Sequence, residues 1–95
     1  MDSQSRVIVK IEGHVQGVGF RFFAQEQAQR LALTGWVRNT FQGEVEAVAE
    51  GSRENIESWL KRLRSGPGNA YVTNLKVEWS EYKGEFKRFQ IVSTL

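Results

Sequence analysis

The spacing of the apolar residues switches from a period of two to a helical period near residue 20, and this switch limits the fold more than any other feature. Residues 7–12 place Val7, Val9 and Ile11 on one side of an extended chain, as in a strand with one buried face. From Phe20 to Leu31 the apolar residues recur at close to helical spacing, and Gly35 stands where a helix C-cap is expected. The sequence therefore predicts a strand, then a helix of roughly 14 residues.

A β-hairpin is predicted after this helix. Residues 36–39 form a short strand, residues 40–43 a turn, and residues 44–50 a second strand. In this second strand Val45, Ala47 and Ala49 face away from the glutamates at 44, 46 and 50. We expect the apolar side to be buried and the glutamates to lie on the solvent side.

A second helix and a long strand complete the pattern. Ser52 can cap a helix whose apolar stripe is spaced i, i+3, i+4 and i+7, and Gly66-Pro67-Gly68 ends it. The stripe consists of Ile56, Trp59, Leu60 and Leu63. Alternation resumes from Tyr71 through Thr73, Leu75 and Val77 to Trp79, and residues 89–92 could add a short fifth strand. We expect the aromatic residues that follow these periods to belong to the core.

The predicted order of elements, βαββαβ with a short tail strand, is typical of an α+β ferredoxin-like sandwich. In this fold two helices cover one face of an antiparallel sheet. We expect residues 1–95 to form a single domain, in which residues 1–6 are a flexible N-terminus. The fold hosts many functions, so the function has to be argued from a site.

The composition excludes several classes of site. No cysteine is present, the only histidine is His14, and the acidic residues show no metal-ligand spacing, so we expect no metal and no cofactor. The net charge is +2 with basic and acidic residues interspersed, and no segment is apolar enough for a signal peptide or a membrane span. We therefore expect a cytoplasmic monomer that binds neither nucleic acid nor membranes. An RNA-binding module of this fold would carry aromatic residues on its third strand, where this chain has glutamates.

A glycine-rich junction between the first strand and the first helix is the best candidate for a functional site. Gly13, Gly17 and Gly19 allow backbone conformations in which successive N–H groups point into one concavity, and the start of a helix adds further N–H donors. Arg21 places a cation at this helix start, where the helix dipole disfavours it by about 0.3–1 kcal/mol unless an anion compensates. The junction is either a phosphate site or an ordinary tight turn. Its spacing matches neither the nucleotide P-loop nor the dinucleotide fingerprint.

The second candidate residue is Asn39. A helix of about 14 residues carries the chain roughly 21 Å from the junction. Residues 35–39 then return about 15 Å, parallel to the first strand as a right-handed crossover requires. Asn39 should therefore end near the level of the glycine-rich loop. Its amide can hold a water molecule and donate to an anion, although an asparagine at a strand end is most often a turn former.

Two motifs at this point resemble the signatures of the acylphosphatase family. They are residues 13–21, with the sequence GHVQGVGFR, and residues 35–39, with the sequence GWVRN, continued by Gly43, Val45 and Gly51. The resemblance spans nearly the whole chain, since its length, its element order and the Gly-Pro after the second helix also look like that family. The last strand and the C-terminal residues match least.

The resemblance implies metal-independent hydrolysis of the carboxyl–phosphate bond of small acyl phosphates, with no cofactor. Arg21 is then the phosphate-binding catalytic arginine and Asn39 the water-positioning asparagine. The phosphate cradle is formed by the backbone N–H groups of Gly17, Val18, Gly19, Phe20 and Arg21. Inorganic phosphate is expected as product and competitive inhibitor. The alternative is a ferredoxin-like module that binds phosphate or a phosphoprotein without catalysis.

Overall fold

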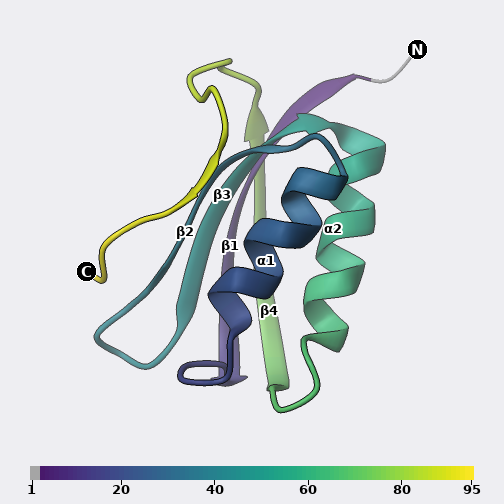
Figure 1. Cartoon of the computed structure of the whole chain (residues 1–95). Coiled ribbons are helices and arrows are strands. Elements are labelled where there is room, and N and C mark those ends of the chain that lie inside the picture. Colours follow the sequence, from purple (N-terminus) through teal and green to yellow (C-terminus); the bar gives the residue numbers. More distant parts are fainter. Residues whose placement is uncertain (1–2) are drawn as a thin grey trace.

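The computed structural model describes residues 3–95 as two helices packed on one face of a five-stranded sheet (Figure 1). The elements in chain order are β1 (Gln4–His14), α1 (Phe20–Arg30), β2 (Thr34–Asn39), β3 (Val45–Ser52), α2 (Arg53–Ser65), β4 (Tyr71–Glu81) and β5 (Phe89–Ile91). The order of elements agrees with the predicted α+β ferredoxin-like sandwich, and the short fifth strand is present. Within residues 3–95 no helix is long and apolar enough to cross a membrane.

The sheet has the strand order β4-β1-β3-β2-β5. The pairs β1–β3, β1–β4 and β2–β3 are antiparallel, as we expected. The expectation of a wholly antiparallel sheet is wrong for the edge strand, because β5 pairs with β2 in parallel, with Gly35 opposite Phe89. The segment between β4 and β5 crosses from one edge of the sheet to the other and so brings β5 in alongside β2 (Figure 1).

The first strand begins earlier than its apolar alternation indicates. Gln4 pairs with Ser52 and Arg6 with Glu50, so residues 4–6 belong to β1. We expected residues 1–6 to be a flexible N-terminus, and for residues 4–6 this expectation is wrong. Residues 1 and 2 lie outside the described range. Residues 4–6 have no apolar alternation. Backbone pairing with β3 holds them, and that pairing leaves no local mark in the sequence.

The first helix ends sooner than predicted, and Gly35 has a different role. α1 stops at Arg30, Leu31 is its C-cap residue, and Ala32 adopts the left-handed conformation with φ of 57°. Gly35 lies in β2, where an added Cβ would stand 1.9 Å from the carbonyl oxygen of Val48 on β3. Gly35 is thus required for the close approach of two strands, and it does not end the helix.

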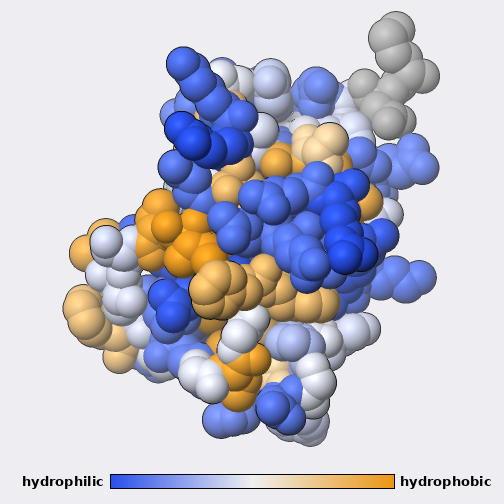
Figure 2. Space-filling model, in the orientation of Figure 1, coloured by the Kyte–Doolittle hydropathy of each residue, from blue (hydrophilic) through white to orange (hydrophobic). Residues whose placement is uncertain are grey.

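Both helices bury apolar side chains against the sheet. The core includes Phe20, Ala24 and Ala28 of α1, the predicted stripe of α2, and the inward residues of β1, β2 and β3. The indole N–H of Trp59 donates to the carbonyl oxygen of Ala24 at 3.0 Å, which links the two helices inside the core. The hydrophilic surface lies over the outer side of α2 and the C-terminal half of α1 (Figure 2). Burying each large core side chain contributes about 1.5–3 kcal/mol.

A β-bulge changes which side chains of β4 face the helices. The register between β1 and β4 shifts at Gly13, which stands opposite Val72, so that Thr73 is an extra residue. Val72 is therefore half-buried, while Tyr71 and Thr73 are exposed. Our expectation that Tyr71 and Thr73 share the inward face of Leu75 is wrong, because one extra residue reverses the alternation.

Candidate active site

The loop between β1 and α1 keeps its shape through one buried anchor and two left-handed glycines. Val15 is buried at the start of the loop, and Gly17 and Gly19 have φ angles of 74° and 77°. An added Cβ at either glycine would meet no heavy atom within 4 Å. These two glycines are needed for their backbone conformation, because space is freely available around them.

The loop leaves its backbone donors without protein partners. Within residues 3–95 no hydrogen bond runs from the N–H groups of residues 17–21 to a protein acceptor, and the first bond of this turn is Phe23 N–H to the Gly19 oxygen at 3.0 Å. The predicted cradle residues Gly17, Val18, Gly19, Phe20 and Arg21 are thus contiguous donors at a helix start. Such a group of donors is suited to an anion.

The N-terminus of α2 provides a contrast with that of α1. At α2, the hydroxyl of Ser52 accepts a hydrogen bond from the Asn55 N–H at 3.1 Å, and Glu54 supplies a negative charge in the first turn. The N-cap residue of α1 is Gly19, which has no side chain to cap the helix, and the first turn holds no acidic residue. The positive end of the α1 dipole is therefore left for an external negative charge.

Arg21 lies in the first turn of α1 and is half-buried. Among residues 3–95 it forms no salt bridge, whereas Arg6, Arg30, Arg38 and Arg53 are each within 4.0 Å of a carboxylate. A guanidinium group at the positive end of a helix and without a carboxylate partner adds to the attraction for an anion. It also offers the planar, two-pronged donor geometry that fits a phosphate group.

Gln16 connects the loop to the β2–β3 turn. Its side-chain N–H₂ donates to the carbonyl oxygens of Thr40 and Glu44, both at 2.8 Å. The turn itself is closed by the Thr40 N–H, which donates to the Glu44 oxygen at 2.9 Å. Sequence reasoning gave Gln16 no role, because a single amide in a loop does not reveal a partner 24 residues away. The two hydrogen bonds of Gln16 fix the glycine-rich loop relative to the end of β2.

Asn39 is the last residue of β2 and carries an unpaired buried acceptor. Its side-chain oxygen Oδ1 is buried and has no hydrogen-bond partner in residues 3–95. Leaving such a group unpaired costs about 1–3 kcal/mol. Native proteins rarely tolerate this cost without a reason. Because Thr40 follows Asn39 and is bound to Gln16, the structure brings Asn39 to the end of the molecule that holds the loop (Figure 1).

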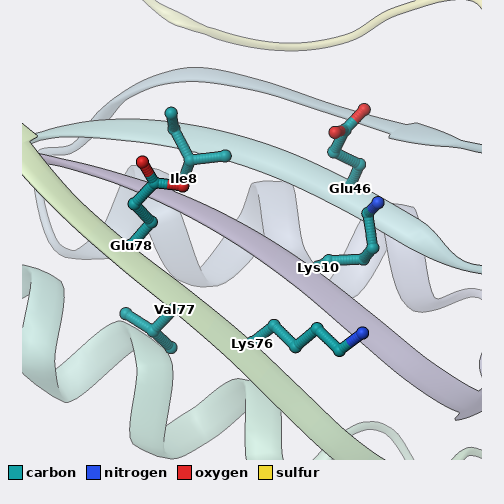
Figure 3. A pocket seen from close by; sticks show the side chains of 6 residues that line it. All are labelled: Ile8, Lys10, Glu46, Lys76, Val77 and Glu78. Carbon is teal, nitrogen blue, oxygen red and sulfur yellow. The ribbon is translucent and has the colours of Figure 1, made fainter.

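The open face of the sheet carries a shallow pocket of about 330 Å³, lined by Ile8, Lys10, Glu46, Lys76, Val77 and Glu78 (Figure 3). None of the predicted site residues lines it. Its charges are largely paired: Lys10 with Glu44, Lys76 with Glu12, and Glu46 with Arg38. This pocket is therefore a poor candidate for the anion site. Among residues 3–95 no three potential metal-ligating side chains form a cluster.

Known proteins are similar to this chain in both sequence and fold. The acylphosphatase family model matches residues 7–91. The chain is 50% identical over 86 residues to an acylphosphatase of Syntrophotalea carbinolica, covering 90% of this chain and 94% of that relative. It is 48% identical over 92 residues to an acylphosphatase of Pyrobaculum aerophilum, covering 96% and 97% of the two chains.

The solved structures agree with this relationship. The crystal structure of the Bacillus subtilis acylphosphatase aligns with a TM-score of 0.90 and 36% identity, over 93% of this chain and 98% of that chain. The structure of an acylphosphatase from Coxiella burnetii aligns with a TM-score of 0.89 and 36% identity, over 94% of this chain and 93% of that chain. Because the family model covers most of the chain and relatives about half identical match over nearly their full length, the chain belongs to the acylphosphatase family.

Proposed function

We propose that this chain hydrolyses the carboxyl–phosphate bond of small acyl phosphates without a metal ion, using Arg21 and Asn39. The observation that carries this proposal is the unpaired buried oxygen of Asn39, next to a turn that Gln16 ties to a loop of unpaired N–H donors. The loop is suited to holding a phosphate group. The orphaned oxygen is suited to holding a water molecule beside it.

The phosphate group is held by charge and by preorganised dipoles. Among residues 3–95 the N–H groups of residues 17–21 have no protein acceptor, and Arg21 adds a guanidinium in the first turn of α1, whose N-cap residue has no side chain to cap it. Phosphoryl transfer passes through a loose transition state in most analyses, with negative charge on the equatorial oxygens. Donors fixed in place before the reaction stabilise this charge, and here they act where other enzymes use magnesium.

The attacking water is positioned by Asn39. Its Oδ1 accepts a hydrogen bond from the water, whose oxygen forms the new bond to phosphorus while the bond from phosphorus to the carboxyl oxygen breaks. The bonding electrons leave with the carboxylate, and both protons of the water end on the phosphate product. A carboxylate whose acid has a pKa of about 4 departs without a general acid, so the site needs none. Orientation of the water is the main contribution of Asn39.

The test is turnover of benzoyl phosphate by the purified chain, compared with a phosphate monoester. We expect hydrolysis of the acyl phosphate, little or no hydrolysis of the monoester, and an unchanged rate in EDTA. A rate that EDTA abolishes and magnesium restores would contradict the metal-independent mechanism. Binding of inorganic phosphate without turnover of benzoyl phosphate would instead favour a phosphate-binding or phosphoprotein-binding module.

Two further properties complete the proposal. Inorganic phosphate is a competitive inhibitor, since it occupies the same donors as the phosphoryl group of the substrate; initial rates at several phosphate concentrations test this. The protein acts as a cytoplasmic monomer, which cell fractionation and sedimentation equilibrium check. A dimer at micromolar concentration would contradict the monomer.

A further inference from the structure

Exposed apolar side chains gather at the end of the molecule that carries the candidate site. Among residues 3–95 five large apolar side chains are strongly exposed: Phe22 at 69%, Phe41 at 79%, Tyr71 at 71%, Leu95 at 65% and Tyr82 at 47%. The first four lie at the site end, and Tyr82 follows β4 at the opposite end. Single exposed apolar residues are ordinary, but a group around one site points to a binding role.

The positions of three of these side chains follow from their neighbours. Phe22 comes directly after Arg21 in the first turn of α1, where side chains lean toward the helix N-terminus and so toward the loop. Phe41 follows Asn39 by two residues and lies in the turn that Gln16 holds against the loop. We call Phe22, Phe41 and Tyr71 the apolar rim.

Tyr71 adds the third side of this rim. It pairs with His14, the last residue of β1, directly before the loop begins. Hydrophobic side chains also collect in the view of the surface around the start of α1 and the loop before it (Figure 2). The rim residues thus come from three separate elements, each next to the loop, or to the turn that Gln16 holds against it, in the chain or in the sheet. None of its three side chains belongs to the core.

The reaction geometry indicates what this rim contacts. In an in-line displacement the leaving group departs on the side of the phosphorus opposite the attacking water. The water is held by Asn39 Oδ1, which is buried, so the leaving carboxylate points outward. The part of the substrate that projects beyond the loop is the acyl chain. Aromatic rings at the rim offer it a large apolar contact area.

We propose that the apolar rim binds the acyl chain and makes this enzyme prefer acyl phosphates with extended apolar chains over acetyl phosphate. The inference rests on the proposed function and adds the substrate class. Each CH₂ fully buried on transfer from water is worth up to about fourfold in affinity. An open rim covers only part of the chain. A hexanoyl chain, with four CH₂ groups more than acetyl, should therefore gain on the order of tenfold in kcat/KM.

The test compares hexanoyl phosphate with acetyl phosphate, whose leaving groups are carboxylates of similar basicity. The ratio of their kcat/KM values is measured for the native chain and for Phe22→Ala, Phe41→Ala and the double variant. We expect the ratio to fall from about tenfold to about twofold in the double variant, with intermediate values for the single variants. Tyr82→Ala is the matched control, an exposed aromatic residue at the other end, and should keep the native ratio.

The outcomes separate the two proposals. If the native chain hydrolyses both substrates and the double variant keeps the native ratio, the rim does not bind the acyl chain. An equal fall in Tyr82→Ala would also overturn the inference, because it would trace the effect to something other than the rim. If the double variant only turns a dimer into a monomer in sedimentation while keeping the ratio, the rim is a self-association surface. Failure of the native chain to hydrolyse either substrate overturns the proposed function and the rim's role together.

Discussion

Each end of the β2–β3 hairpin holds a buried polar group, the carboxylate of Glu50 at one end and the side-chain oxygen of Asn39 at the other, but among residues 3–95 only the carboxylate has hydrogen-bond partners. Glu50, near the end of β3, accepts hydrogen bonds from Arg6 at 3.0 Å and from the N–H groups of Lys83 at 2.7 Å and Glu85 at 3.2 Å. At the other end, Asn39 is half-buried, but its side-chain oxygen Oδ1 is buried and has no partner among residues 3–95. One group is satisfied by the protein itself, and the other is available to a ligand.

This difference separates stability from function. Glu50 fastens the segment between β4 and β5 to the sheet, because two of its donors belong to that segment. Among residues 3–95 the Asn39 side chain holds no other element in place, so its buried oxygen is a cost to the fold that a bound molecule can offset. We expect changes at Asn39 and its neighbours to act on rate, and changes at Glu50 to act on folding.

Asn39→Ala should give the largest effect on turnover. Loss of the water-positioning group is expected to lower kcat on the order of 10³-fold while affinity for inorganic phosphate stays largely intact. Because the oxygen is unpaired, the free energy of unfolding in phosphate-free buffer should not fall. Initial rates with and without added phosphate measure kcat and phosphate affinity, and urea denaturation measures the free energy of unfolding.

Asn74→Ala is the matched control, since its exposed amide donates to the Glu12 side chain on β1 and not to the loop or the β2–β3 turn, and its rate should stay near native. Equal loss of kcat and of phosphate affinity in Asn39→Ala would reassign Asn39 to binding. A marked loss of stability would contradict the comparison with Glu50.

Arg21→Lys should behave almost like Arg21→Ala. An ammonium group keeps the charge but cannot reproduce the two-pronged donor geometry of guanidinium, so both variants should lose on the order of 10²–10³-fold in kcat/KM. Both should also bind inorganic phosphate more weakly, which isothermal titration measures. Arg64→Ala, at an exposed position in the last turn of α2, serves as the control. Retained phosphate inhibition in Arg21→Ala would remove the anion site from the α1 N-terminus.

Gln16→Glu tests whether the link between loop and turn matters. The side chain keeps its shape, but an ionised carboxylate cannot donate to the carbonyl oxygens of Thr40 and Glu44. We expect kcat to fall on the order of tenfold, because Asn39 is then held less well relative to the loop. Phosphate affinity should change much less than kcat. A fall in phosphate affinity as large as the fall in kcat would show that Gln16 shapes the cradle itself.

The sequence predicted the parts of the molecule that local patterns determine. The stripe of α2, its cap at Ser52 and the donors at the start of α1 each depend on residues within one or two turns of each other. The resemblance of two motifs supplied roles for Arg21 and Asn39, and these roles remain predictions. Asn39 and Arg21 lie far apart along the chain, but the expected lengths of the first helix and of the strand that returns from it predicted that both lie at the same end of the molecule.

The features that could not be predicted depend on contacts between distant parts of the chain. Glu50 has the alternation of a solvent-facing strand residue, and we expected it to be exposed. Its partners Arg6 and Lys83 lie 44 and 33 residues away, which no local pattern reveals. The close approach at Gly35 has the same origin, because it depends on Val48 in the neighbouring strand.

Glu50→Gln should have the smallest effect on turnover and a clear effect on stability. We expect kcat/KM within about twofold of native, because Glu50 lies at the end of the hairpin opposite the site. The free energy of unfolding should fall by about 1.5–3 kcal/mol, because the hydrogen bonds that Arg6, Lys83 and Glu85 donate to a buried charge are weakened, while Arg6 keeps its ion pair with Glu85. Glu46→Gln on the same strand, whose partner Arg38 is partly exposed, should cost less than about 1 kcal/mol. An equal loss of unfolding free energy in the two variants would mean that the burial of Glu50 does not make its hydrogen bonds more stabilising than those of the partly exposed Glu46.

The pH dependence of stability sharpens this last point. Burial alone would raise the pKa of Glu50, but the hydrogen bonds from the Lys83 N–H, the Arg6 side chain and the Glu85 N–H outweigh it and hold the pKa below its ordinary value. A carboxylate with a lower pKa in the folded state contributes its full stability above its unfolded pKa of about 4.3 and loses it as the pH falls through the folded pKa. The native chain should therefore lose stability on acidification below about pH 4.5 more steeply than Glu50→Gln does. Urea midpoints between pH 3 and pH 7 measure this difference. Parallel curves for the two proteins would show that Glu50 does not cause the loss of stability in acid. The hydrogen bonds to Glu50 would then account for the position of the segment between β4 and β5, but not for the stability of the fold.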